Sequence, residues 1–287
     1  MSFPAFLETA WSEHTDHPQE VADRLAQSLH RVTAAVDIAP FVHLLTHVFG
    51  EHLGQWQGGV DVLESLRRTP AFDGAAEPAL NRSIAALRYA GGDDTALASL
   101  SVPDRVWALA AAASALAGRV EFTRALAAFA EALRLASAGL PSGSPAVRAL
   151  AVAGNNLAAA LEEKTDRDAG ETQAMVTAAE AGLRHWKLAG TWLEEERAEY
   201  RLARSLLHAG EPVAAMQSAG RCLELCLRND APAFEQFFGY AVLALAQRAA
   251  GDHDAFSASR RRAWALREQV PVEERPWCET ELEELGG

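Results

Sequence analysis

Residues that commonly carry redox chemistry are scarce in this sequence. Only three cysteines occur among 287 residues, and none stands in Cys-x-x-Cys spacing. Cys222 and Cys226 lie one helical turn apart, where small buried residues are expected. We therefore predict that the cysteines are structural and do not form a redox or metal-binding set.

Lysine is nearly absent, and the charge balance is acidic. Neither of the two lysines, Lys164 and Lys187, follows the glycine-rich strand-to-helix loop of a phosphate-binding site. Twenty-six basic against thirty-nine acidic residues give a net charge of -13, which repels a phosphate backbone. The sequence thus argues against nucleotide hydrolysis and against nucleic acid as a partner. The short basic run 260–262 does not change this expectation.

Long apolar runs are also missing. The longest, 106–117, is too short to span a bilayer. The first residues lack a basic leader followed by an apolar stretch, so we expect a cytoplasmic protein that does not contact membranes. No serine, cysteine or carboxylate pair stands in a recognisable nucleophile or acid/base signature, and we expect no enzymatic activity.

Strand-forming patterns are absent as well, while alanine and leucine dominate. The three tyrosines, Tyr89, Tyr200 and Tyr240, all lie in stretches with helical periodicity. Proline is limited to 12 positions, consistent with helices separated by short connections. The sequence predicts an all-α fold.

One element recurs: an amphipathic helix, a turn containing glycine, and a second helix with small residues on one face. The clearest copy, 195–228, has Leu202-Ala203 in its first helix, Gly210 at the turn, and Ala215 and Cys222 in its second helix. A second copy begins near Phe234 and turns at Gly251, 41 residues after the first turn glycine.

These two copies resemble the tetratricopeptide repeat, which pairs large and small apolar residues in helix A with small residues in helix B. Phe256 departs from the pattern where a small residue is expected. Asn155-Asn156-Leu157-Ala158 is similar to helix A of longer-repeat members, followed by an irregular turn at 164–170 and a helix from about Glu171. Weaker likenesses cover 47–69 and 106–136, and a short helix pair is predicted over 78–100.

The resemblance implies a right-handed α-α superhelix, a solenoid of about five to six helix pairs. We expect atypical N-terminal capping helices in 1–36, helical repeats over 37–271, and an acidic, partly helical tail in 272–287. Each pair leaves an apolar face that only a neighbouring pair covers. All three segments are therefore expected to form one continuous unit.

A basic stripe on one predicted helix is the main candidate binding surface. In tetratricopeptide-repeat proteins, the side chains of helix A line a concave groove. A guanidinium group can bind a carboxylate through two hydrogen bonds. Asn155 and Asn156 would extend this groove through amide contacts to a peptide backbone. The alternative is a solvated helix face compensated by Glu194 and Glu199. The stripe comprises Arg197, Tyr200, Arg201, Arg204 and His208.

A second candidate is a histidine-rich helix near the N-terminus. His43, His47 and Glu51 recur every four residues and share one face, so they could ligate a transition metal. His30 would be a fourth ligand if the helices around Ala35-Val36-Asp37 form a hairpin. The alternative is that these histidines lie on a helix surface beside an apolar core.

Two functions follow from these patterns. The first is a non-enzymatic, cofactor-free scaffold or adaptor that binds a protein or peptide in its concave groove, through an acidic group or carboxylate. The second is a regulatory helical-repeat protein that senses a divalent transition metal or another ligand through the N-terminal histidines.

Overall fold

The structure, a computed structural model, describes residues 2–286. Within this range every regular element is helical, and fourteen α-helices pack in neighbouring pairs with no strand. The all-α prediction is confirmed. No helix in the described range is long and apolar enough to cross a bilayer. The chain divides into two compact units, Met1–Ala153 and Gly154–Gly287.

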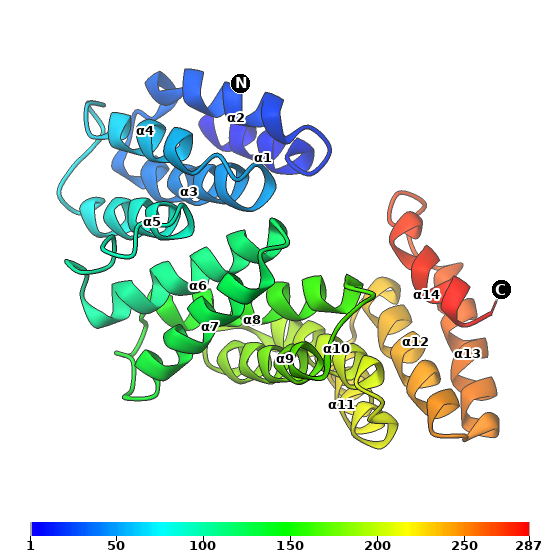
Figure 1. The fold of residues 1–287 in the computed structure, drawn as a ribbon. Helices are drawn as coiled ribbons and strands as arrows, with labels where there is room; N and C mark the ends of the chain where they lie inside the picture. Colours follow the sequence, from blue (N-terminus) through cyan, green and yellow to red (C-terminus); the bar gives the residue numbers. More distant parts are fainter. Residues whose placement is uncertain (1, 287) are drawn as a thin grey trace. The chain divides into compact units, whose positions relative to one another are not determined.

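The first unit contains the helices α1 to α7, which Figure 1 labels, together with two short turns and the first part of α8 (Pro145–Glu163). Its core lies among α1 to α5, where aliphatic and aromatic residues at helical spacing are fully buried, among them Phe41, Leu44 and Leu63. The elements are α1 (Phe3–Glu13), α2 (Pro18–Gln27), α3 (Ala35–His47), the π turn η2 (Val48–His52), α4 (Trp56–Leu66), α5 (Glu77–Ala90), α6 (Val102–Gly118) and α7 (Phe122–Ala136). A short 3-10 turn, η1 (Leu29–Arg31), precedes α3.

The helix pair predicted over 78–100 is wrong in its second half. The first helix, α5, ends at Ala90, but the residues that follow form consecutive turns instead of a helix. Gly92 has φ +101°, and the Asp93 carboxylate accepts hydrogen bonds from the backbone N and the hydroxyl of Thr95 at 3.0 and 2.6 Å. Such side-chain-to-backbone bonds compete with helix formation.

The second unit contains the two clearest predicted helix pairs, and both are present. They are α10 (Trp192–His208) with α11 (Pro212–Arg228), and α12 (Ala233–Ala249) with α13 (His253–Arg267). Their turns need a left-handed residue, which Gly210 and Gly251 supply with φ of +76° and +82°. Ala215, Cys222 and Ala263 are completely buried, as the small-residue pattern predicts.

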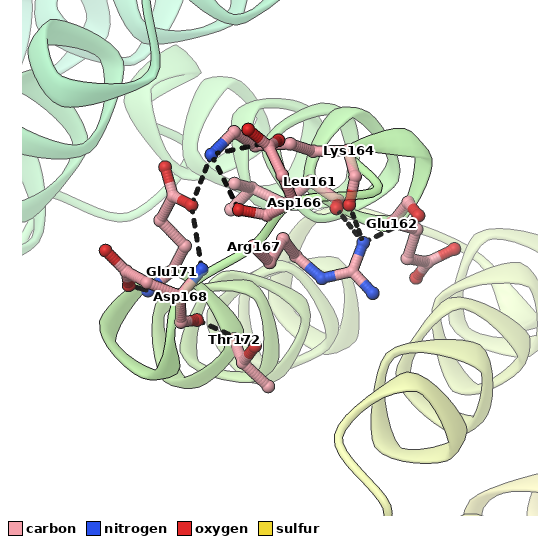
Figure 2. Close-up of polar contacts among 8 residues, drawn as sticks. All are labelled: Leu161, Glu162, Lys164, Asp166, Arg167, Asp168, Glu171 and Thr172. Atoms are coloured by element: carbon pink, nitrogen blue, oxygen red, sulfur yellow. Dashed lines mark hydrogen bonds and ion pairs between the residues drawn. The ribbon is translucent and has the colours of Figure 1, made fainter.

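The helices α8 (Pro145–Glu163) and α9 (Ala169–Ala189) are joined by a turn that polar side chains hold closed (Figure 2). Nη1 of Arg167 donates to the carbonyl oxygens of Leu161 and Glu162 in the last turn of α8 and to that of Lys164 just after it. Asp168 and Glu171 form a capping box at the start of α9, and Lys164 pairs with Glu171. The turn predicted to be irregular is thus specifically hydrogen-bonded, and α9 begins at Ala169, two residues before the predicted start.

Two helices approach very closely at Gly154. A Cβ atom added to Gly154 would lie 2.6 Å from the carbonyl oxygen of Ala178 and 2.7 Å from the backbone N of Gly182. The backbones of α8 and α9 therefore meet with no room for a side chain.

The C-terminal segment packs onto the second unit. It consists of η3 (Arg275–Cys278) and α14 (Glu279–Glu284). Cys278, Leu282 and Leu285 are buried in a core shared with Phe237 and Ala241 of α12. The acidic segment expected as a partly helical tail is therefore anchored by an apolar face.

Candidate functional site

The five residues of the basic stripe all lie on α10, but the chain itself supplies carboxylates to them. Arg197 forms an ion pair with Glu235 of α12, and Arg201 forms one with Glu162 of α8. Glu162 also accepts a 2.6 Å hydrogen bond from the hydroxyl of Ser205. Both carboxylates are largely buried, so these contacts tie neighbouring helices together.

The remaining stripe contacts lead to the C-terminal helix. Nη1 and Nη2 of Arg204 donate to the two carboxylate oxygens of Glu284 at 2.5 and 2.8 Å, and the Tyr200 hydroxyl donates to Glu281. Nη1 of Arg248 donates to the backbone oxygen of Glu284 at 2.7 Å. The hydrogen bonds from Arg204 lower the pKa of Glu284, which keeps its carboxylate charged.

His208 ends α10 next to the turn between α8 and α9. Its Nδ1 lies 3.4 Å from Nη2 of Arg167. Desolvation, together with the charges of Arg204 and Arg167, lowers the pKa of His208, so the imidazole is favoured in its neutral form.

Of the two glutamates predicted to compensate the stripe, Glu194 acts on Arg197 through its charge, whereas Glu199 pairs with other cations. Among residues 2–286 no hydrogen bond joins Asn155 or Asn156 to the stripe, although Oδ1 of Asn155 is shielded from solvent without a hydrogen-bond partner. Glu199 is buried and pairs with Lys187 and Arg221, while Glu194 accepts hydrogen bonds from Thr191 at the start of α10. The close carboxylate partners of the stripe thus come from α8, α12 and α14.

The histidine candidates of the first unit separate into two groups. His47, the last residue of α3, lies with Nδ1 3.1 Å from the Glu51 carboxylate, as the four-residue spacing predicts. His43 packs against the same Trp11 ring as His47, with ring centroids 5.5 Å apart, but it does not belong to the group of close ligand atoms described below. His30 lies on η1 beside the carbonyl oxygen of Gln27, and no hydrogen bond or ring contact links it to the other histidines in the described chain.

Two histidines that the helical spacing did not single out join His47. His14 follows α1, His52 ends η2, and their ring centroids lie 5.0 and 4.8 Å from that of His47. One ring nitrogen from each of the three lies within 4.8 Å of the others. We call His14, His47 and His52 the histidine cluster. Each member is partly exposed to solvent, and Trp11 forms one wall.

The π turn η2 explains why sequence spacing missed His52. In an α-helix, residues five apart point in different directions, whereas a π turn is closed by bonds between residues five apart, such as the 3.2 Å bond from Leu53 N to the Val48 oxygen. The turn lies directly against α6. A Cβ on Gly118 would come within 2.8 Å of the Glu51 oxygen, and Arg119 donates to the His52 oxygen at 2.7 Å.

A third cluster is buried between α10 and α11. The Sγ of Cys222 donates to Oε1 of Glu196 at 2.9 Å, and Cys226 lies beside them. Desolvation and the nearby Glu235 raise the pKa of Glu196 to about 7. All three cysteines of the chain are buried free thiols, and burial raises the pKa of Cys278 to about 11. These are inert thiols in a packed interior.

No protein-family model and no curated protein matches this chain. The resemblance to tetratricopeptide repeats therefore rests only on the residues of this chain, above all those at the turns and close helix contacts of α10 to α13.

Proposed function

We propose that the protein is a non-enzymatic binding scaffold of the helical-repeat class, which binds an acidic amphipathic helix of a partner protein on the α10 stripe. The helix pairs α10/α11 and α12/α13 support a repeat architecture of the right-handed superhelical kind, because their glycine turns and buried small residues follow the tetratricopeptide pattern. The stripe is its binding surface.

The observation that carries the proposal is the occupation of Tyr200 and Arg204 by α14. A short terminal helix places Glu281 and Glu284 on these two side chains and buries Leu282 and Leu285 against α12. The surface is thus chemically complementary to a helix with acidic residues three apart, each followed by leucine. A partner helix with the same pattern would replace α14 on it.

Of the stripe's carboxylate contacts, those of α14 are the ones a partner can most easily replace. Arg197 and Arg201 pair with carboxylates that are 8% and 7% exposed on helices of 17 and 19 residues, whereas Glu284 is 38% exposed on a helix of six residues. A short helix with an exposed ion pair opens at lower free energy than a long helix with buried ones. Binding therefore competes with the chain's own C-terminal helix.

A labelled peptide of residues 273–287 tests this competition on the full-length protein. In the double variant Glu281→Gln/Glu284→Gln the internal helix loses its charged contacts, while Tyr200 and Arg204 remain. Charged hydrogen bonds contribute about 1.5–3 kcal/mol each, so we expect the added peptide to bind this variant at least about tenfold more tightly than wild type by fluorescence anisotropy.

The matched control is Glu279→Gln/Glu283→Gln, which makes the same charge change on the exposed side of α14 and is expected to leave peptide affinity at the wild-type value. Adding Arg204→Glu to the first variant is expected to abolish binding. Equal affinity for both double variants, or binding that survives Arg204→Glu, would show that the stripe is not the binding surface. A physiological partner captured by the first variant must contribute an acidic helix whose binding Arg204→Glu removes.

A further inference from the structure

The histidine cluster of the first unit has the donor set of a metal site. Three imidazoles converge from segments distant in sequence, the ends of α1, α3 and η2. We propose that His14, His47 and His52 bind one zinc ion through their Nε2 atoms and leave a fourth coordination position for water. This site differs from the set His30, His43, His47 and Glu51 that helical spacing indicates.

Proton positions in the cluster favour this arrangement. Nδ1 of His14 lies 2.5 Å from the carbonyl oxygen of Trp11, and Nδ1 of His47 lies 3.1 Å from the Glu51 carboxylate. Both oxygens can only accept, so both Nδ1 atoms carry the proton and both Nε2 atoms present a lone pair. A metal-ligating histidine typically donates its other N–H to a carboxylate or a carbonyl oxygen in this way.

The spacing of the nitrogens also fits. A tetrahedral zinc ion with Zn–N bonds of about 2.0–2.1 Å places its ligand atoms about 3.3 Å apart. The Nε2 atoms of His47 and His52 are 3.1 Å apart, and a ligand atom of His14 lies within 4.8 Å of both. We expect zinc binding to draw the His14 imidazole closer to the other two. Without zinc, the Nε2–H of His52 donates a hydrogen bond to Nε2 of His47, and zinc binding requires the other tautomer of His52, with its proton on Nδ1.

Local electrostatics and rigidity add to the donor set. His14 lies at the C-terminal end of α1, and His52 lies at the C-terminal end of the continuous helix formed by α3 and η2, where helix dipoles favour a cation. The Glu51 carboxylate adds a negative charge that attracts a metal cation. The positive charge of Arg119, which donates to the His52 carbonyl oxygen, acts against this attraction. Imidazole ligands without thiolates suit zinc and neighbouring divalent metals, and all three cysteines lie in the other unit.

Isothermal titration of chelator-treated, full-length protein with ZnCl₂ tests the proposal. We expect one zinc ion per chain, and at least a hundredfold loss of affinity in His14→Ala and in His52→Ala. His30→Ala and His17→Ala, which remove exposed histidines of the same unit, are expected to bind like wild type. Cobalt(II) is expected to give the visible spectrum of a tetrahedral site in wild type only.

Two further measurements keep the test decisive if a ligand variant does not fold. Glu51→Gln retains all three ligands but removes the carboxylate that orients His47, so we expect zinc affinity to fall about 10–100-fold. Cobalt is also expected to quench Trp11 fluorescence, a change that Trp11→Phe removes. Absence of zinc binding in wild type, or loss of binding in His30→Ala with retention in His52→Ala, would overturn the proposal. These variants lie outside the α10 stripe, so the two proposals fail independently.

Discussion

At the scale of single residues, Glu196 is a buried carboxyl of the second unit with a strongly raised pKa. It is 1% exposed, its Oε1 accepts from Cys222, and its Oε2 has no hydrogen-bond partner. Its pKa of about 7 means that the folded protein holds this proton at a pH where an unfolded chain has released it. The cause is desolvation first and the neighbouring Glu235 carboxylate second.

The stability of the protein is therefore expected to fall as pH rises through this window. Below about pH 4.5 both states hold the proton; between 4.5 and about 7 only the folded state does, so increasing pH favours unfolding. A shift of this size corresponds to about 3 kcal/mol lost between pH 4.5 and 8. Urea unfolding of Glu196→Gln is expected to lack this loss, so the variant exceeds wild type in stability at pH 8.

Glu224→Gln provides the control, because Glu224 is exposed on the same helix as Cys222. It is expected to show the wild-type pH dependence. A Glu196→Gln variant that loses stability between pH 5 and 8 as steeply as wild type would mean that Glu196 is ionised in the folded protein at neutral pH.

Contacts between residues that are distant in the sequence are the features least predictable from it. The basic stripe was visible from its helical spacing, but its partners were not, because Tyr200 and Glu281 are 81 positions apart. His47 and Glu51 follow the four-residue rule of an α-helix and were found together. His52 lies five residues after His47 and reaches it through a π turn, for which the sequence offers no periodic signal.

At the scale of helices, the boundaries next to the glycine turns of α10 to α13 could be predicted, because Gly210 and Gly251 mark them. The helices α10 to α13 agree with the predicted pairs, and Ser144 hydrogen-bonds the start of α8 as a cap. The helix predicted after Ala90 does not form. The Asp93 carboxylate accepts hydrogen bonds from the backbone N and the hydroxyl of Thr95, and such local bonds compete with helical ones. A small residue in a helix indicates a close contact with another helix, but the sequence does not identify that other helix.

Gly154 provides the sharpest test of such a contact. Replacing it with alanine places a methyl group against the α9 backbone, so we expect Gly154→Ala to lower the free energy of unfolding by about 1–3 kcal/mol, the usual cost of overpacking. Gly220, on an exposed part of α11, has nothing within 4 Å of an added Cβ. Gly220→Ala is expected to gain about 0.5–1 kcal/mol from higher helix propensity. Thermal melts of both variants separate packing from propensity, and equal shifts would contradict the close approach.

At the scale of the whole chain, the division into two compact units gives the zinc proposal a spatial prediction. A ligand that binds only the folded form stabilises the cooperative unit to which it binds, by an amount set by its concentration relative to its Kd. The histidine cluster lies entirely in Met1–Ala153, so zinc should slow amide hydrogen exchange mainly in α1, α3 and η2. Amides of α10 to α13 should exchange at unchanged rates.

Hydrogen exchange with mass spectrometry, with and without zinc, measures both sets of peptides in one sample. His52→Ala serves as the matched control, since zinc should then change exchange in neither unit. Equal protection of α1 and α12 by zinc in wild type would mean that the two units open as one. In that case zinc would raise the free energy of unfolding of both units together, not only of the unit that contains the histidine cluster.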